Sequence, residues 1–454
     1  MELRPYQKED VAYLSGIYSV GIFNEQRTGK TPTALSLIKK VNQWRKINKV
    51  LIIAPASTLY NWKREYELWL GRPCAICKGT PSKRSGIITN WKDGLVISYD
   101  SLKTTKRSEG HIAEILKQKP DCVIVDEVHR IKDRNSATTR AVWAFDKLTT
   151  KIVLSGTPAP NYPHEIWSIL RFLYPTTFKS YWKFIEEYFE TNLSYAGGNK
   201  HIEIGGFRSK DKEQKLLRFL NKMSIVRKRK DVMPWLPAKD YQRVYLSATP
   251  QQRKYLDELA EYFEIEGTNI VTQGVLDRLI RYRQICLHPG ILSLKGSSPK
   301  LDFLKEYVKD YPDKSIIIFT KFTTFIDILQ ESFKDAGFIT GQTTLKKRQD
   351  IMEDFQQGKL KVLIAQIDTC KEGLTLDRAE TIIFTDKFPP AADIQQAEDR
   401  FVATTKEKAN KEHTIIELIL QDTYDQQLYE LLQKNMSAID IVNNFKNYLK
   451  ETAK

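Results

Sequence analysis

Two short segments in the first third of the chain carry residues that could bind and cleave a phosphate chain. The first, residues 21–31, ends in Gly29-Lys30-Thr31, and helical periodicity resumes directly after it. A tight loop that opens a helix turns backbone N–H groups and the positive helix end toward a phosphate. Lys30 would then reach the β- and γ-phosphates, Thr31 would offer a hydroxyl to Mg²⁺, and Gly29 would permit close approach. The complete G-x-x-x-x-G-K-[ST] pattern is not met, because Asn24 stands where its first glycine belongs.

The second segment delivers two carboxylates to the end of an apolar strand. Residues 122–125 are apolar and lead into Asp126 and Glu127, 96 residues after Lys30. Asp126 would hold Mg²⁺ directly or through water, and Glu127 would polarise an attacking water. The pair could instead only cap the strand. Its combination with Gly-Lys-Thr favours a site that binds and hydrolyses ATP with Mg²⁺.

The elements that must position these residues follow the rhythm of βα units, in which functional groups sit at the carboxyl ends of buried parallel strands. The rhythm occurs twice along the chain. The expected strands of the first half are residues 50–54, 95–98, 122–125 and 152–154, and those of the second half are 316–319, 362–365, 381–384 and 415–418.

The segment between the two halves, roughly residues 161–300, is rich in aromatic residues and helical patterning. We expect helical protrusions there, whose aromatics at 181–189 form a core rather than stack on bases. The predicted first domain is residues 1–232, with a helical protrusion from about 160. The predicted second domain is residues 233–454, with a helical insertion at about 245–300, a linker near 233–239 and a C-terminal helical brace at 424–449.

Composition favours a polyanionic partner. Lys and Arg number 71 against 56 Asp and Glu, so the formal net charge is +15 and the pI is about 9.3. No signal-peptide pattern and no run of ~20 apolar residues occurs, which predicts a soluble intracellular protein. Cys74 and Cys77 form a lone C-x-x-C without the second pair that a structural zinc site needs.

At these residues the sequence resembles the SWI/SNF-like, Snf-type DNA translocases of helicase superfamily two. The resemblance extends over nearly the whole chain, and its motifs follow the family order. The matching segments are the entry motif (3–7), motifs I (24–31), Ia (53–62), Ib (96–100), II (126–129) and III (154–158), the junction 227–239, a branch signature at 283–289, and motifs IV (317–320), V (372–376) and VI (396–400).

The resemblance implies an α/β fold of two RecA-like lobes, with parallel sheets flanked by helices and with helical protrusions. It implies catalytic roles for Lys30, Asp126, Glu127 and Arg400. Nucleotide contacts are expected from Gln7, which would read adenine, and from Thr28, Gly29, Lys30, Thr31, Gly373, Gln396 and Arg400. Contacts to the nucleic-acid backbone are expected from Trp62, Lys63, Ser98, Ser101, Lys321 and Thr369, and the run 227–230 is a further candidate.

Three departures from the family pattern bear on catalysis. Arg27 replaces a usual glycine of motif I, Lys371 replaces one of motif V, and Ala403 stands where motif VI has a second arginine. That arginine commonly acts as a finger on the γ-phosphate, which can contribute about 10³-fold in rate. Either Arg400 acts alone, or Lys406 substitutes, or turnover is slow.

The leading hypothesis is therefore a DNA-dependent ATPase that translocates on double-stranded or branched DNA. Motifs V and VI look closest to the annealing and fork-remodelling members, which suggests work on replication forks or recombination intermediates. Two alternatives remain: a conventional strand-separating DNA or RNA helicase, and a weakly catalytic binding protein switched by ATP. The near-minimal motor suggests a bacterial or viral origin and is compatible with a monomer.

Overall fold

The computed structural model describes most of the chain, and it divides the protein into two compact units, Met1–Pro234 and Trp235–Lys454. The predicted boundary after residue 232 lies two residues before this division. Each unit has its own sheet. The described residues are 2–104, 110–156, 158–159, 162–196, 199–235, 239–272, 274–369, 376, 378–386, 413–433, 441 and 444–449.

Unit 1 is built on a parallel sheet of seven strands in the order β3-β4-β2-β5-β6-β1-β9. Side chains of β5 alternate between two apolar clusters, with Val123 and Val125 in one and Cys122 and Ile124 in the other. Both faces are therefore covered, as parallel sheets require. The strands are β1 (Ser19–Ile22), β2 (Val50–Ala54), β3 (Cys74–Cys77), β4 (Gly94–Ser98), β5 (Cys122–Val125), β6 (Thr150–Leu154) and β9 (Ser224–Ile225).

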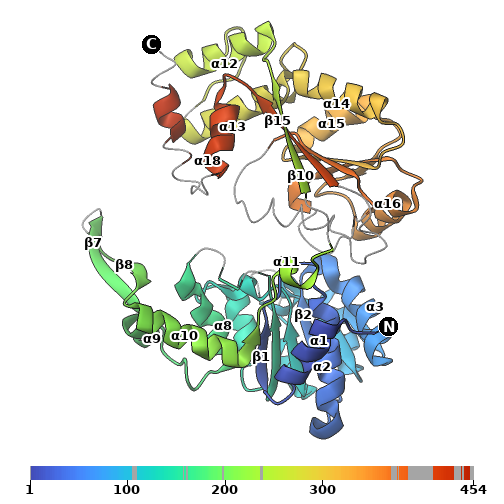
Figure 1. Ribbon diagram of the computed structural model, residues 1–454, viewed down its shortest axis with the longest axis vertical. Helices are drawn as coiled ribbons and strands as arrows, with labels where there is room; N and C mark the ends of the chain where they lie inside the picture. Colours follow the sequence, from blue (N-terminus) through green and yellow to red (C-terminus); the bar gives the residue numbers. More distant parts are fainter. Residues whose placement is uncertain are drawn as a thin grey trace. The chain divides into compact units, whose positions relative to one another are not determined.

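Helices surround this sheet (Figure 1). Because the strands run parallel, the loops after β1, β2, β4, β5 and β6 leave from one edge, and those loops carry motifs I to III. The helices and 3₁₀ turns are α1 (Pro5–Leu14), α2 (Lys30–Arg45), η1 (Ala56–Thr58), α3 (Leu59–Leu70), α4 (Pro81–Thr89), α5 (Tyr99–Leu102), α6 (Ile112–Lys117), η2 (Val128–Ile131), α7 (Ala137–Trp143), η3 (Pro163–Glu165), α8 (Ile166–Leu173), α9 (Tyr181–Tyr188), α10 (Lys210–Met223) and α11 (Arg229–Val232).

The expected protrusion is only partly helical, which corrects the prediction. Between α9 and α10 the chain forms an antiparallel hairpin, β7 (Phe189–Ala196) and β8 (Asn199–Phe207), which projects from the two helices in Figure 1. At its base the rings of Phe189 and Phe207 stack with centroids 4.7 Å apart. Phe184 and Tyr188 of α9 are buried, so these aromatics do form a core.

Unit 2 is built on a parallel sheet of six strands in the order β10-β15-β14-β11-β13-β12. In β11, Ile317 and Phe319 face one apolar cluster, and Ile316 and Ile318 face the other. The elements are β10 (Lys239–Leu246), α12 (Pro250–Tyr262), α13 (Val275–Leu287), η4 (Pro289–Leu292), α14 (Pro299–Asp310), β11 (Ile316–Thr320), α15 (Thr323–Ser332), β12 (Gly337–Ile339), α16 (Leu345–Gln357), β13 (Val362–Gln366), η5 (Ile367–Thr369), β14 (Thr381–Phe384), β15 (His413–Leu420) and α18 (Tyr424–Gln433).

The C-terminal helical stretch packs within unit 2. The ring of Phe445 lies 4.6 Å from that of Tyr424 and 5.6 Å from that of Tyr282 on α13, so residues near the end of the chain join the α12–α13 core. Within the described ranges no helix is both long and apolar enough to cross a membrane. Two parallel sheets, each flanked by helices, confirm the predicted class of two RecA-like α/β lobes.

Candidate nucleotide-binding site

The loop between β1 and α2 has the geometry of a phosphate-binding turn. Lys30 is the first residue of α2, and Gly29 precedes it with a φ of +79°, in the left-handed region. A Cβ on Gly29 would lie 2.2 Å from the Nε2 atom of Gln7. Glycine is therefore required twice, by the backbone conformation and by the close approach of Gln7.

Helix α1 holds this loop from outside. The Gln7 side chain donates from Nε2 to the carbonyl oxygens of Thr28, at 3.3 Å, and Gly29, at 3.2 Å, and its Oε1 atom accepts from the backbone N–H of Arg4 at 2.8 Å. The Tyr6 hydroxyl also donates to the Thr28 carbonyl, at 2.8 Å. The Gln7 amide is thus engaged with the loop, and its predicted adenine contact would replace some of these bonds.

The Lys30 ammonium lies inside the loop. Its Nζ atom donates to the carbonyl oxygens of Asn24, at 3.0 Å, and Glu25, at 3.3 Å. Phosphate oxygens could replace these carbonyls as stronger, charged acceptors. Arg27, which stands where the family usually has glycine, keeps a left-handed φ of +67° at a cost of about 1 kcal/mol.

Asp126 follows β5 and is fixed by two donors. The indole Nε1 of Trp62, on α3, donates to Asp126 Oδ2 at 2.8 Å, and the backbone N–H of Glu127 donates to Oδ1 at 3.0 Å. The Tyr99 hydroxyl donates to the Asp126 carbonyl oxygen at 2.5 Å. Each carboxylate oxygen keeps a lone pair that can bind a cation or water.

The position of Trp62 suggests a different role from the predicted one. Its side chain is 1% exposed and its only polar atom is bonded to Asp126, so it has no surface to offer a nucleic-acid backbone. The motif Ia helix thus turns the Trp62 indole toward Asp126, which argues against a side-chain contact to nucleic acid, and that contact stays a prediction. The next residue, Lys63, forms an ion pair with Glu67 one turn later on α3. Its nucleic-acid contact stays a prediction.

Glu127 has the geometry of a residue that polarises water. It adopts a left-handed φ of +50° and is 8% exposed. Its Oε2 atom is buried and accepts no hydrogen bond from the described residues, and the Nδ1 atom of His129 lies 3.4 Å away. The same His129 nitrogen lies 3.2 Å from the Ser155 hydroxyl after β6. A carboxylate oriented by a histidine can accept a proton from a water that enters the site.

Electrostatics at this edge favour a cation. Burial and the neighbouring Glu127 carboxylate raise the pKa of Asp126, while the Trp62 hydrogen bond and the Lys30 charge lower it. The Lys30 ammonium thus favours the charged form of the Asp126 carboxylate. Mg²⁺ typically takes one or two protein ligands plus phosphates and waters, which fits the Asp126 carboxylate and the Thr31 hydroxyl. The described residues hold no cluster of three acidic, histidine or cysteine groups that could cage a metal without a nucleotide.

Ser98 and Ser101, two residues of unit 1 predicted to contact nucleic acid, have hydroxyl groups that already make hydrogen bonds. Ser98 caps α5 and accepts from the backbone N–H of Ser101 at 3.2 Å. The Ser98 hydroxyl donates to the Ser101 hydroxyl at 3.0 Å, which also accepts from Arg84 at 3.2 Å. Ser98 is buried and Ser101 partly exposed. Both contacts stay predictions, and Ser101 is the better placed of the two.

In unit 2, Lys321 and Thr369 follow the neighbouring strands β11 and β13 at one sheet edge. Gln366 links them, because its Nε2 atom donates to the Lys321 carbonyl at 3.3 Å and its own carbonyl accepts from the Thr369 hydroxyl at 2.7 Å. Their predicted contacts to nucleic acid are therefore compatible with one surface. The predicted residues Gly373, Gln396 and Arg400, the departures Lys371 and Ala403, and the candidate substitute Lys406 lie outside the described residues.

The C-x-x-C pair does not form a metal site. Cys74 and Cys77 lie on β3 and belong to apolar clusters on opposite faces of the sheet, so they cannot ligate one ion. Burial raises the pKa of each thiol to about 12. Both are therefore core residues with little thiolate character.

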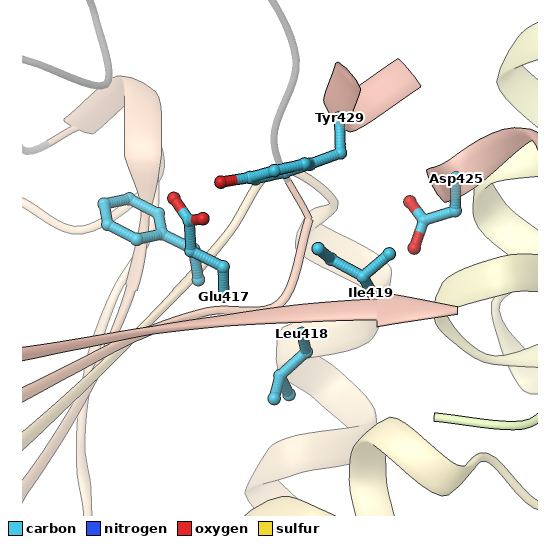
Figure 2. Close-up of a pocket in the computed structure, with 6 residues that line it drawn as sticks. Glu417, Leu418, Ile419, Asp425 and Tyr429 are labelled. Carbon is cyan, nitrogen blue, oxygen red and sulfur yellow. The ribbon is translucent and has the colours of Figure 1, made fainter. Parts of the chain in front are cut away.

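A pocket in unit 2 contains none of the predicted site residues. It is lined by Phe384, Glu417, Leu418, Ile419, Asp425 and Tyr429. Figure 2 shows the Tyr429 hydroxyl extending over β15 toward Glu417. That hydroxyl accepts from Arg243 of β10 at 2.8 Å, and Asp425 accepts from the buried ammonium of Lys300 at 2.8 Å. These bonds tie α18 and α14 to the sheet, and we assign the pocket a structural role.

Sequence reasoning missed the residues that hold the catalytic groups. Tyr6 bonds to the loop, and Trp62 and Tyr99 both bond to Asp126. Ser155 bonds to His129. One signal was present, since aromatic residues with a polar tip commonly bond a partner when buried next to predicted strands. The partner itself could not be inferred.

Comparison with known proteins gives consistent results along the chain. The SNF2-related domain matches residues 6–291 and the Helicase conserved C-terminal domain matches residues 299–402. The SWI/SNF-related matrix-associated actin-dependent regulator of chromatin subfamily A member 1 of Homo sapiens is 26% identical over 97% of this chain and 43% of its own length. The nuclear protein STH1/NPS1 of Saccharomyces cerevisiae is 25% identical over 97% of this chain and 34% of its own length.

The chain thus spans about two fifths of the length of these curated relatives. Among solved structures, the Sulfolobus solfataricus SWI2/SNF2 ATPase core in complex with dsDNA is 22% identical, covers 96% of this chain and 91% of its own, and gives a TM-score of 0.44. The fold assignment therefore rests on the sheets of this chain, and the family assignment on the matched domains. With the SNF2-related domain covering well over half of its residues, the chain belongs to the SNF2-related family of helicase superfamily two.

Proposed function

We propose that the protein is a DNA-dependent ATPase that uses Mg²⁺-ATP to translocate along double-stranded DNA. One observation carries this proposal: Lys30, at the start of α2 after β1, and the Asp126–Glu127 pair, after β5, follow parallel strands of one sheet and so lie at its same edge. The Gly29–Lys30 turn offers a cationic cradle for phosphates, and the two acidic residues offer a cation ligand and a base. The alternative, that Asp-Glu only caps a strand, leaves the buried Glu127 carboxylate without a purpose.

The residues would divide the reaction as follows. The loop N–H groups and Lys30 would bind the β- and γ-phosphates, and Asp126 and Thr31 would hold Mg²⁺, which would supply positive charge against the phosphates. Trp62 keeps the Asp126 carboxylate oriented. Glu127 orients a water and accepts its proton, while His129 and Ser155 keep Glu127 in place. Arg400 would supply the second lobe's contact to the γ-phosphate, which hydrolysis would release.

Several observations support DNA as the track. The chain carries a net charge of +15, and phosphate contacts made by such a protein are sequence-neutral and salt-sensitive. A similar human protein is named as a regulator of chromatin, whose core is DNA wrapped on protein. Lys63, Ser101, Lys321 and Thr369 are the residues that we propose contact the DNA backbone.

We further propose forked or four-way DNA as the preferred substrate, in replication or repair of a bacterial or viral genome, with a monomer as the working form. The sequences of motifs V and VI support this finer proposal, because they resemble those of the annealing and fork-remodelling members. A strand-separating helicase is the second candidate, and the Ala403 departure supports the third, a slow ATP-switched binding protein.

The test measures phosphate release with single-stranded, duplex, forked and four-way DNA. We expect stimulation by duplex DNA and the largest stimulation by branched DNA. Glu127→Gln should lower turnover by about 10²–10⁴-fold and spare ATP binding, because it removes the proton acceptor and keeps the volume. Normal hydrolysis by Glu127→Gln would contradict the role of Glu127. Equal rates with and without every DNA would favour the ATP-switched protein, and strand displacement would favour the helicase.

A further inference from the structure

A buried aspartate joins the phosphate-binding loop to the segment that precedes the second unit. Asp10, on α1, is fully buried. Its Oδ2 atom accepts from Nδ2 of Asn24, in the loop, at 3.1 Å. Its Oδ1 atom accepts from Arg227, with Nε at 2.9 Å and a terminal nitrogen at 2.7 Å. A buried carboxylate with two partners from distant segments fixes those segments relative to each other.

Backbone bonds reinforce the same connection. Strand β9 pairs with β1, and the N–H of Phe23 donates to the Ile225 carbonyl at 2.8 Å. The N–H of Glu25 donates to the Arg227 carbonyl at 3.0 Å, and the Glu25 carboxylate accepts from the N–H of Arg229 at 2.7 Å. Residues 225–229 therefore lie alongside residues 23–25 and are hydrogen-bonded to them. Arg227 lies seven residues before the division between the units at Pro234.

The two loop residues held in this way are also the two that Lys30 contacts. Lys30 donates to the carbonyls of Asn24 and Glu25, the acceptors that a bound phosphate would displace. Release of these carbonyls would alter the loop at the positions bonded to Asp10, Arg227 and Arg229. These contacts offer a route from the nucleotide site to the chain segment that leads into the second unit.

We propose that Asp10 and Arg227 are positioning residues that couple the nucleotide state of the loop to the junction at residues 225–234, so that DNA engagement and ATP turnover depend on each other. The proposal rests on the proposed ATPase function. It gives Arg227 a different role from the backbone contact considered for the run 227–230, because its guanidinium is committed to Asp10 and Glu9.

The first test compares Arg227→Gln with Arg218→Gln in the full chain. Arg218, on α10, loses the same charge but is well exposed and pairs only loosely with Asp211, at 3.8 Å. Couplings of this kind are worth about 5–150-fold. We expect Arg227→Gln to lower the DNA-stimulated kcat at least about fivefold, with the DNA-free rate and duplex affinity close to those of the control, and Arg227→Lys to recover part of the stimulation.

The outcomes separate the alternatives. Stimulation in Arg227→Gln equal to that of Arg218→Gln overturns the coupling, and so does a loss confined to DNA affinity, which would make Arg227 a DNA contact. No ATPase activity in the unmodified protein would instead refute the proposed function.

A second test needs no variant. Hydrogen exchange of the unmodified protein, with and without a non-hydrolysable Mg²⁺-ATP analogue, should show the amides of residues 23–25 and 225–232 changing protection together. A change at 23–25 with none at 225–232 overturns the proposal even where a variant fails to fold.

Discussion

Replacement of Trp62 by phenylalanine tests whether this residue serves the nucleotide site or nucleic acid. Trp62→Phe keeps a buried ring and removes the indole N–H that donates to Asp126 Oδ2 at 2.8 Å. A hydrogen bond to a charged group contributes about 1.5–3 kcal/mol, which corresponds to roughly 10–150-fold. Loss of a residue that orients a metal ligand typically lowers metal affinity or activity by about 10–100-fold. We therefore expect the Mg²⁺ concentration for half-maximal ATPase to rise about tenfold or more, with duplex affinity nearly unchanged.

The matched control is Trp69→Phe on the same helix. Trp69 also donates its indole N–H, in this case to Glu65 at 3.0 Å, and it lies away from Asp126. The control should keep the Mg²⁺ dependence of the unmodified protein. A variant Trp62→Phe with normal Mg²⁺ dependence and weakened DNA binding would refute the reasoning and restore the motif Ia prediction.

Three further predictions follow from the packing. Gly29→Ala should abolish nucleotide binding, measured with a fluorescent ATP analogue, because a Cβ would lie 2.2 Å from Gln7 and a left-handed alanine costs about 1–2 kcal/mol; binding within twofold of the parent would contradict it. Asp386→Ala should destabilise unit 2 by about 3–5 kcal/mol in urea unfolding, because it removes the buried carboxylate that pairs with the Arg283 guanidinium at 3.2 Å, and a loss below 1 kcal/mol would argue against the pair. Burial lowers the pKa of Lys151 to about 8, so the folded protein binds this proton less well than the unfolded chain does. The charged lysine therefore lowers the free energy of unfolding below about pH 8, and that loss is recovered as the pH rises from about 8 toward 10.5. Lys151→Met should therefore be more stable than the parent in urea at pH 7 and lose that advantage by pH 10; an advantage that does not shrink with pH would contradict the titration.

Buried strands were the most predictable part of the fold. Strands β2, β5 and β14 begin and end at the residues that their sequences predict. A strand covered on both faces is a nearly continuous apolar run, so its ends are easy to recognise in the sequence. The hairpin β7–β8 was missed, because its half-exposed strands follow directly on the aromatic helix α9. Strand β9 has only two residues, and no periodicity can reveal so short an element.

At the candidate site the motifs predicted Lys30, Asp126 and Glu127, because their chemistry demands particular residue types beside particular elements. Their supporting contacts were not predictable. Trp62 and Asp126 are 64 residues apart, and Asp10 and Arg227 are 217 apart, and nothing local in the sequence indicates which polar side chains will meet inside a fold. The same limit explains why the motif alone does not reveal the bond between Trp62 and Asp126.

The measurement that tests the central claim most directly is ATP-driven displacement of a third strand from a DNA triplex by this chain. A motor that advances along the duplex should release the third strand with ATP and Mg²⁺, and Glu127→Gln should release none. Hydrolysis of ATP without any release, or equal release by Glu127→Gln, would contradict translocation powered at the Lys30–Asp126–Glu127 site.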